Sequence, residues 1–463
     1  MQFGPLYIDV DQINRFFSEQ STWEIISQIT AMGGWLILFH LLFFAGLAMW
    51  VEWKESRYTA HWKWVVLAVD IPLLNVQTPK AVEQIFAHLA GAHEHEDIAK
   101  KFWHGYKQPH FSFEIISIEG YIQFLIRTEE TFRDLVEAAV YAQYPEVEIT
   151  EVDDYVTSVP TQFPNETHNM WGADFTLTES DTYPLRTYQD FEHTISKDTQ
   201  LKDPMAAFLE SFTRIGPGEQ LWFQILVQPT GNDWKEKGIA KVKELVGDTG
   251  HGHHGGSQIL QALANAPIKV LEFAGQQIFG GEEDAHAESN DDSGPPNKIQ
   301  YLTPGESKLV EGIEEKISKI GFKTKMRGVY IARKEVFKVQ RAVSALIGAI
   351  NQFNIPSANS LAPTYGVHTS YVGAVWRANY RKRLLMNAYK KRKMKVGANP
   401  FILNIEELAT IWHFPMSHIK TPSLQKIEGK RAEPPATLPI ERVVAPISGS
   451  LEEVNEPPPM KFG

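Results

Sequence analysis

Residues 33–51 read GGWLILFHLLFFAGLAMWV, nineteen consecutive positions without an acidic or basic side chain. As a helix this segment would span about 28 Å, close to the hydrocarbon thickness of a bilayer. Trp35 lies near one end and Trp50 and Trp53 near the other, as in an interfacial aromatic belt. Acidic residues precede the segment, whereas a signal peptide begins with a basic region. The sequence therefore predicts a transmembrane helix within residues 25–53, after an external segment 1–24.

The cations that flank this segment predict its orientation. Lys54, Arg57 and Lys63 follow it, and only Arg15 precedes it. Because Lys and Arg are retained on the cytoplasmic side, the N-terminus is expected outside and the bulk of the chain in the cytoplasm. The absence of cysteine agrees with a reducing compartment and excludes disulfides and thiolate sites. The predicted location is the cytoplasmic membrane, crossed once.

Residues 62–155 alternate strand and helix signals. Thr78-Pro79 opens a helix whose apolar residues recur at intervals of three and four, and Glu119-Gly120 joins two apolar strands as a hairpin. A second amphipathic helix follows and stops at Pro145. Strands at 64–71, 111–118, 121–126 and 147–152 complete the order βαββαβ, which is that of the ferredoxin-like split motif.

A second copy of this order is expected in residues 170–415. Its strands are predicted at 174–177, 220–227 and 322–332, with helices after Asp203-Pro204 and over 336–350. An insertion at 232–320 contains helical patterns at 234–246 and 307–320 around a flexible stretch, 247–304. The predicted fold class is α+β: one N-terminal transmembrane helix, two ferredoxin-like domains, and a disordered proline-rich tail at 432–463.

Catalytic signatures are missing from the sequence. It contains no Walker A, H-E-x-x-H or G-x-S-x-G motif. The histidines at 251, 253 and 254 lie in a glycine-rich stretch that a solvated loop explains without a metal. No catalytic residue, cofactor or metal is predicted, and an enzyme with an unrecognised site is kept as an alternative.

A concentrated basic segment is the best candidate for binding. No acidic residue occurs between Ser360 and Asn404, although the net charge of the whole chain is −11. Trp376, Tyr380 and Leu384 recur every four residues within it. A solvated helix face, contact with anionic lipid and contact with nucleic-acid phosphates are all compatible with this pattern. The candidate residues are Arg377, Arg381, Lys382, Arg383, Lys390, Lys391, Arg392, Lys393 and Lys395.

Three stretches, Phe113–Tyr155, Asp203–Pro229 and Asn387–Pro435, carry a resemblance to a known family. The last contains NAYKKR, EELATIWHFP and AEPP. Together they resemble the region before the motor in membrane-anchored DNA-pumping ATPases of conjugation and type IV secretion. In fused relatives the AEPP-type segment leads into the ATPase domain, whereas this chain ends about thirty residues later. The resemblance implies an accessory role beside a motor supplied by a separate polypeptide.

The function predicted from these features is a non-catalytic membrane-anchored scaffold of a DNA-transfer machine. Its expected partners are the lipid bilayer and a separate P-loop motor, with DNA and further copies of the chain as additional candidates. Leu408, Ile411 and Trp412, in a helix predicted at 406–412, are the candidate motor-docking residues, and a capping helix of the second domain is the alternative. A lipid-surface binder without a DNA role is the competing function.

Overall fold

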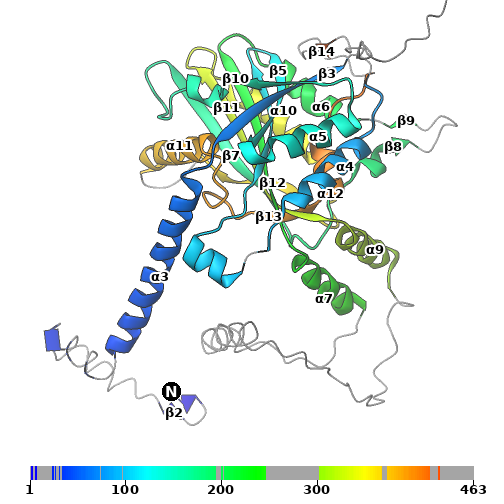
Figure 1. Cartoon of the computed structure of the whole chain (residues 1–463). Helices are drawn as coiled ribbons and strands as arrows, with labels where there is room; N and C mark the ends of the chain where they lie inside the picture. The colour runs from blue at the N-terminus through cyan, green and yellow to red at the C-terminus, as the bar shows by residue number, and fades with distance from the viewer. Residues whose placement is uncertain are drawn as a thin grey trace, which may run out of the picture.

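One large β-sheet organises the chain (Figure 1). The computed structural model describes residues 34–72, 75–95, 97–193, 200–201, 203–246, 302–367, 373–417 and 426–427, with a few isolated positions before residue 34. The sheet has ten strands: β3 (Trp64–Pro72), β4 (Phe111–Ile118), β5 (Tyr121–Glu129), β6 (Glu148–Val152), β7 (His168–Leu177), β10 (Glu219–Pro229), β11 (Gly321–Arg333), β12 (Leu361–Gly366), β13 (Phe401–Asn404) and β14 (Lys426–Ile427). All of its pairings are antiparallel except that of β14 with β3.

The two halves of the chain share this sheet. In the first half the strands lie in the order β6-β3-β5-β4, and in the second half in the order β12-β7-β11-β10. The halves meet where β4 and β10 pair without interruption, from Gln220 opposite Ile118 to Val227 opposite Phe111. Two separate ferredoxin-like domains were predicted, and that fold class is wrong because the sheet and the main hydrophobic core run through both halves. Pairing satisfies the backbone groups that two isolated domains would leave exposed on β4 and β10.

Helices cover both faces of the sheet. On one face lie α4 (Pro79–Leu89), α5 (Arg133–Gln143), α6 (Met205–Thr213), α10 (Val339–Asn351) and α12 (Ile405–Ile411). Among the α-helices of the described part of the chain, only α11 (Ala374–Lys390) supplies side chains to the smaller cluster on the opposite face. Successive residues of β3 show the division, since Leu67 faces the larger cluster and Val66 the smaller. Strands buried on both sides read as continuous apolar runs in the sequence.

Several local predictions are confirmed. β4 and β5 are joined at Glu119 and Gly120, whose φ angles of 54° and 92° suit a two-residue hairpin turn. α7 (Trp234–Val246) has the predicted bounds. α9 (Pro304–Ser318) was predicted over 307–320 and begins three residues earlier, at a capping box formed by Thr303 and Glu306. α7 and α9 pack together, with Gly238 against Ile317. Two small hairpins pair β1 (Gln2–Phe3) with β2 (Leu6–Tyr7) and β8 (Glu192–His193) with β9 (Gln200–Leu201).

The helix that contains most of the predicted membrane span is α3 (Trp35–Thr59), which extends away from the sheet (Figure 1). No helix in the described ranges is both long enough and apolar enough to cross a membrane. This finding contradicts the predicted span at 25–53 and, with it, the single-pass location in the cytoplasmic membrane. The last two turns of α3 carry four charged residues, and its Trp50 indole donates to the carbonyl of Phe102 at 3.0 Å. Phe39, Leu41 and other large apolar side chains of its first half are exposed.

Some predictions fall on residues that the structure does not describe. The predicted flexible stretch lies outside the described residues from 247 to 301, as do the histidines at 251, 253 and 254 and the proline-rich tail at 432–463. Most of the predicted external segment 1–24 and much of 25–33 also lie outside them.

Candidate nucleic-acid interface on helix α11

α11 lies flat on the sheet because one of its faces is apolar. Leu385, Met386 and Tyr389 are buried in the smaller cluster against the strands. Gly172 of β7 lies directly beneath Leu385, and a Cβ at this glycine would clash with the leucine side chain. Because Gly172 has no side chain, α11 can lie close to the sheet at this point of β7.

The outer face of α11 combines aromatic, basic and amide side chains, and we call Trp376, Tyr380, Arg383, Asn387 and Lys391 the aromatic-basic strip. Their spacing of three or four residues places them on one side of the helix. Trp376 is 72% exposed, and its ring is nearly parallel to that of Tyr380, at 16° with 6.0 Å between centroids. The Arg383 guanidinium lies 5.7 Å from the centre of the Tyr380 ring. The strip extends for about 22 Å along the helix.

A hollow accompanies the strip on the side of the loop at 161–164. One cavity of about 390 Å³ lies among Phe163, Pro164, Trp376, Tyr380 and Arg383, with the amides of Gln162 and Asn379. A second, of about 340 Å³, continues along the helix to Asn387. Both are open to solvent and lack acidic residues in their linings. Such a surface offers flat rings for stacking and amides and cations for anionic groups.

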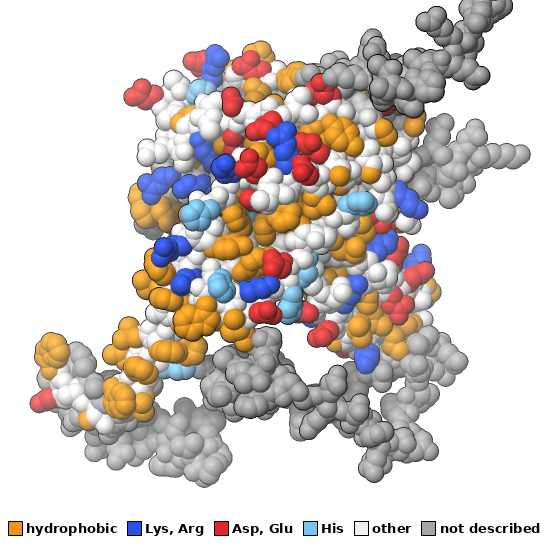
Figure 2. Space-filling view, in the orientation of Figure 1, with side chains coloured by type: hydrophobic (Ala, Val, Ile, Leu, Met, Phe, Trp, Pro, Cys, Tyr) orange, Lys and Arg blue, Asp and Glu red, His pale blue; other side chains and the backbone are white. Residues whose placement is uncertain are grey.

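Four of the predicted basic residues are exposed. Arg383, Lys391, Lys393 and Lys395 lie on the surface, and the Lys395 ammonium is 3.4 Å from the Glu55 carboxylate of α3. Figure 2 shows Lys and Arg side chains at the edge of the molecule where α11 lies. These cations are consistent with contact to phosphate groups.

Four others are partly withdrawn into the domain. The Lys382 ammonium donates to the Asn169 side chain at 2.7 Å, and burial lowers its pKa. Arg381 donates to the Gly366 carbonyl at 3.3 Å. Lys390 donates to the carbonyl of Val159, and desolvation lowers the pKa of this lysine. Arg377 is half-buried.

Arg392 is an internal residue, although it was predicted to be one of the basic residues that bind lipid or nucleic acid. Its guanidinium donates to both oxygens of Glu114 on β4, at 3.0 and 3.1 Å, and to Asp154 at 2.5 and 2.9 Å. Desolvation alone would raise the pKa of Glu114. The charge of Arg392, with hydrogen bonds from Arg392, Ser112 and Gln224, outweighs that effect and lowers the pKa to about 2. Arg392 thus fastens the segment after α11 to the centre of the sheet.

The predicted motor-docking residues are also internal. Leu408, Ile411 and Trp412 are at most 1% exposed and belong to the larger hydrophobic cluster. The Trp412 ring packs edge-on against Phe113 of β4, at 4.8 Å between centroids. In this conformation α12 is a core helix and presents none of these three side chains to a partner.

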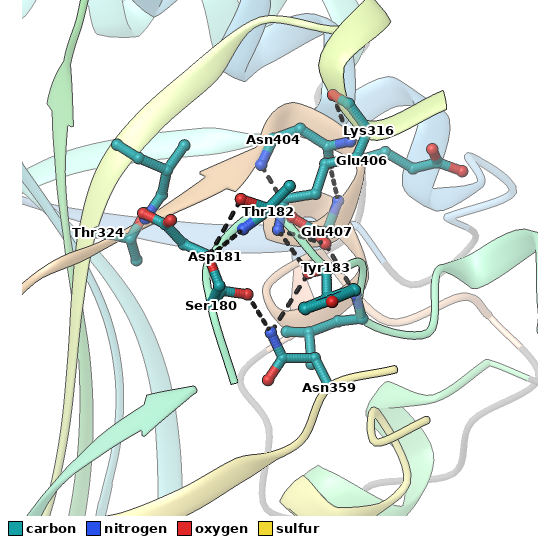
Figure 3. A network of polar contacts seen from close by, with 12 residues as sticks. Ser180, Asp181, Thr182, Tyr183, Lys316, Thr324, Asn359, Asn404, Glu406 and Glu407 are labelled. Carbon is teal, nitrogen blue, oxygen red and sulfur yellow. Dashed lines mark hydrogen bonds and ion pairs between the residues drawn. The ribbon is translucent and has the colours of Figure 1, made fainter. Parts of the chain in front are cut away.

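A third cavity, of about 640 Å³, lies between α9, α12 and the loop at 184–190, next to the polar network of Figure 3. The Lys316 ammonium pairs with Glu407 at 3.1 Å, and Glu407 also accepts hydrogen bonds from the backbone amides of Leu185 and Asn404. Asn359 holds the neighbouring turn through the carbonyls of Ser180 and Tyr183. The carboxylate of Glu407 therefore joins α9 and α12 to the neighbouring backbone. Within the described residues no three metal-ligating side chains come together.

The described residues form an α+β domain built on one large, mostly antiparallel sheet. Residues 72–427 match a family model described as a domain of unknown function, DUF8128. This match covers most of the chain, and the protein belongs to that family. A search of curated proteins finds no match.

Proposed function

We propose that this protein is a non-catalytic scaffold that binds single-stranded nucleic acid along the aromatic-basic strip of α11. In this proposal it is an accessory component of a conjugation-like DNA-transfer machine whose P-loop motor is a separate polypeptide. The observation that carries the proposal is the exposed Trp376–Tyr380 pair with Arg383 beside it. Rings and cations in one groove are the usual means of holding single strands without sequence preference.

The dimensions of the strip suit this ligand. Its length of about 22 Å equals the rise of about six stacked nucleotides at 3.4 Å each. The open hollow beside Trp376 leaves room for bases on the rings, and Arg383, Lys391 and Lys393 are available to the backbone. The DNA-transfer context rests on the three stretches that resemble pre-motor regions.

The proposal is tested by titrating the full chain into a labelled 20-nucleotide oligothymidylate and following fluorescence anisotropy. Trp376→Ala is expected to weaken binding by about 5- to 150-fold, since stacking one base on an aromatic ring contributes about 1–3 kcal/mol. Trp103→Ala is the matched control. Trp103 is 69% exposed and belongs to another element, the helical turn Lys100–His104, which packs on α3. Equal affinity in the wild type and both variants would reject the strip as the binding surface.

The contribution of the basic residues to nucleic-acid binding is tested separately, with its own control. Replacing Arg383, Lys391 and Lys393 with Glu is expected to reduce the slope of log affinity against log salt by about 2, at about 0.7 per phosphate contact. The same reversal at Lys80, Arg214 and Lys237, which are exposed elsewhere, keeps the change in net charge but spares the strip. Equal losses in the two triple variants would indicate nonspecific charge attraction and contradict the proposal.

A further inference from the structure

The groove beside α11 has two chemically different ends. Around Trp376 it is lined by Phe163, Pro164 and Tyr380, rings and apolar atoms that suit proline side chains. Towards the C-terminus of the helix the exposed cations Lys391 and Lys393 follow. A ligand that fits the whole strip would be acidic at one end and rich in proline at the other.

The end of this chain has that composition. Residues 452–459 read EEVNEPPP, with Glu452, Glu453 and Glu456 ahead of three consecutive prolines. In the polyproline II conformation, at 3.1 Å per residue, eight residues extend for about 25 Å, close to the length of about 22 Å for the strip. The segment therefore matches the strip both in length and in the order of its acidic and proline residues.

The segment can also reach the groove. Ile427 of β14 is the last described residue, on the edge of the sheet beside β3. The 25 residues from there to Glu452 span up to about 80 Å when extended. A folded body of about 350 residues has a radius of gyration of only about 20 Å. The connection is therefore long enough to pass from one edge of the sheet to α11.

We infer that residues 452–459 of this chain dock along the aromatic-basic strip of α11. The three prolines lie on Trp376 and Tyr380, and the glutamates lie beside Arg383 and Lys391, so the segment runs antiparallel to the helix. The docked segment occupies the surface that the proposed function gives to single-stranded nucleic acid. It acts as an internal competitor that an incoming strand must displace. The regulatory part of this inference rests on the proposed function, whereas the docking itself does not.

The chain contains no cysteine, so a single introduced pair can report the docking. Asn387→Cys with Asn455→Cys in the full chain is expected to form an intramolecular disulfide under mild oxidation, which requires Cα atoms within about 7 Å. Tyr141→Cys with Asn455→Cys is the control, because Tyr141 is exposed on α5, across the sheet from α11. Similar yields for both pairs, no disulfide, or disulfide-linked dimers alone would overturn docking of the chain on itself.

Charge reversal separates the docking from the proposed function. Changing Glu452, Glu453 and Glu456 to Lys is expected to reduce the Asn387→Cys/Asn455→Cys yield at least fivefold and to tighten oligothymidylate binding. A disulfide that depends on these glutamates, in a chain that binds no oligonucleotide, would retain the docking and reject the proposed function. Oligonucleotide binding to the strip with no disulfide would retain the proposed function and reject the docking.

Discussion

Replacing Arg392 with methionine is expected to destabilise the protein strongly and to reverse one part of its pH dependence. The arginine is fully buried and, among the described residues, is the only cation that forms an ion pair with Glu114. Methionine fills a similar volume but leaves the carboxylate of Glu114 buried without its counter-charge. Removing one partner of a buried ion pair typically costs about 3–5 kcal/mol, so a loss of that size is expected at pH 7.

The pH dependence follows from the carboxyl of Glu114. Its pKa of about 2 in the folded protein lies below the ordinary value of 4.5. In the wild type this contribution to stability is therefore fully present above about pH 4.5 and is lost as the pH falls towards 2. The interval corresponds to about 3 kcal/mol at 1.36 kcal/mol for each tenfold change.

In the variant the sign is opposite. Burial then acts without the charge of Arg392, so the pKa of Glu114 is expected to rise above 4.5. Stability is accordingly lost as the pH rises through the raised pKa, and the variant should be relatively less impaired at pH 4 than at pH 7. Urea unfolding followed by circular dichroism between pH 3 and pH 8 measures both effects.

Two further variants make this test specific. Arg392→Met with Glu114→Gln removes both charges and is expected to recover much of the stability at pH 7. Arg133→Met breaks exposed ion pairs with Glu137 and Glu151 and should change little. The reasoning is refuted if Arg392→Met unfolds at the wild-type urea midpoint, or if its stability rises with pH as in the wild type.

Two other substitutions test the packing of the domain. Asp203→Ala is expected to cost about 1–3 kcal/mol, because the buried imidazole of His413, 2.8 Å from Asp203, loses its hydrogen-bond partner; thermal unfolding measures this, and a change below 1 kcal/mol would contradict it. Gly172→Val is expected to lower stability by about 1–3 kcal/mol, because its side chain would displace Leu385 and lift α11 from the sheet. Faster amide hydrogen exchange confined to α11 would locate the second effect, and unchanged exchange there would count against it.

The local structure could be predicted from the sequence where a short signal determines it. Glu119-Gly120 fixes the β4–β5 hairpin, and the spacing of apolar residues over 234–246 gives the bounds of α7. The joining of the two halves could not be predicted in this way. The apolar run of β4 looks the same whether the strand lies at an edge or pairs with β10, since periodicity reports burial and not the partner.

The candidate site shows the same limit. The basic segment and its Trp376–Tyr380 spacing are visible in the sequence. The structure places the aromatic pair on α11 and the basic residues on α11 and on the segment that follows it. Arg392 lies in the middle of that basic run, and its partners Glu114 and Asp154 are 278 and 238 positions away in the sequence. Nothing local distinguishes it from the exposed Lys391 and Lys393. A clue exists only in Glu114, the one charged residue of the buried strand β4, which requires a counter-charge.

The central claim is that single-stranded nucleic acid lies on the aromatic-basic strip, and photocrosslinking tests it most directly. The full chain is irradiated with an oligonucleotide that carries 5-iodouracil, and the adducts are located by mass spectrometry. We expect adducts at Trp376 or Tyr380, lost in Trp376→Ala with Tyr380→Ala and retained in Trp103→Ala. Adducts confined to residues away from α11, or no adduct at concentrations that saturate binding, would contradict it.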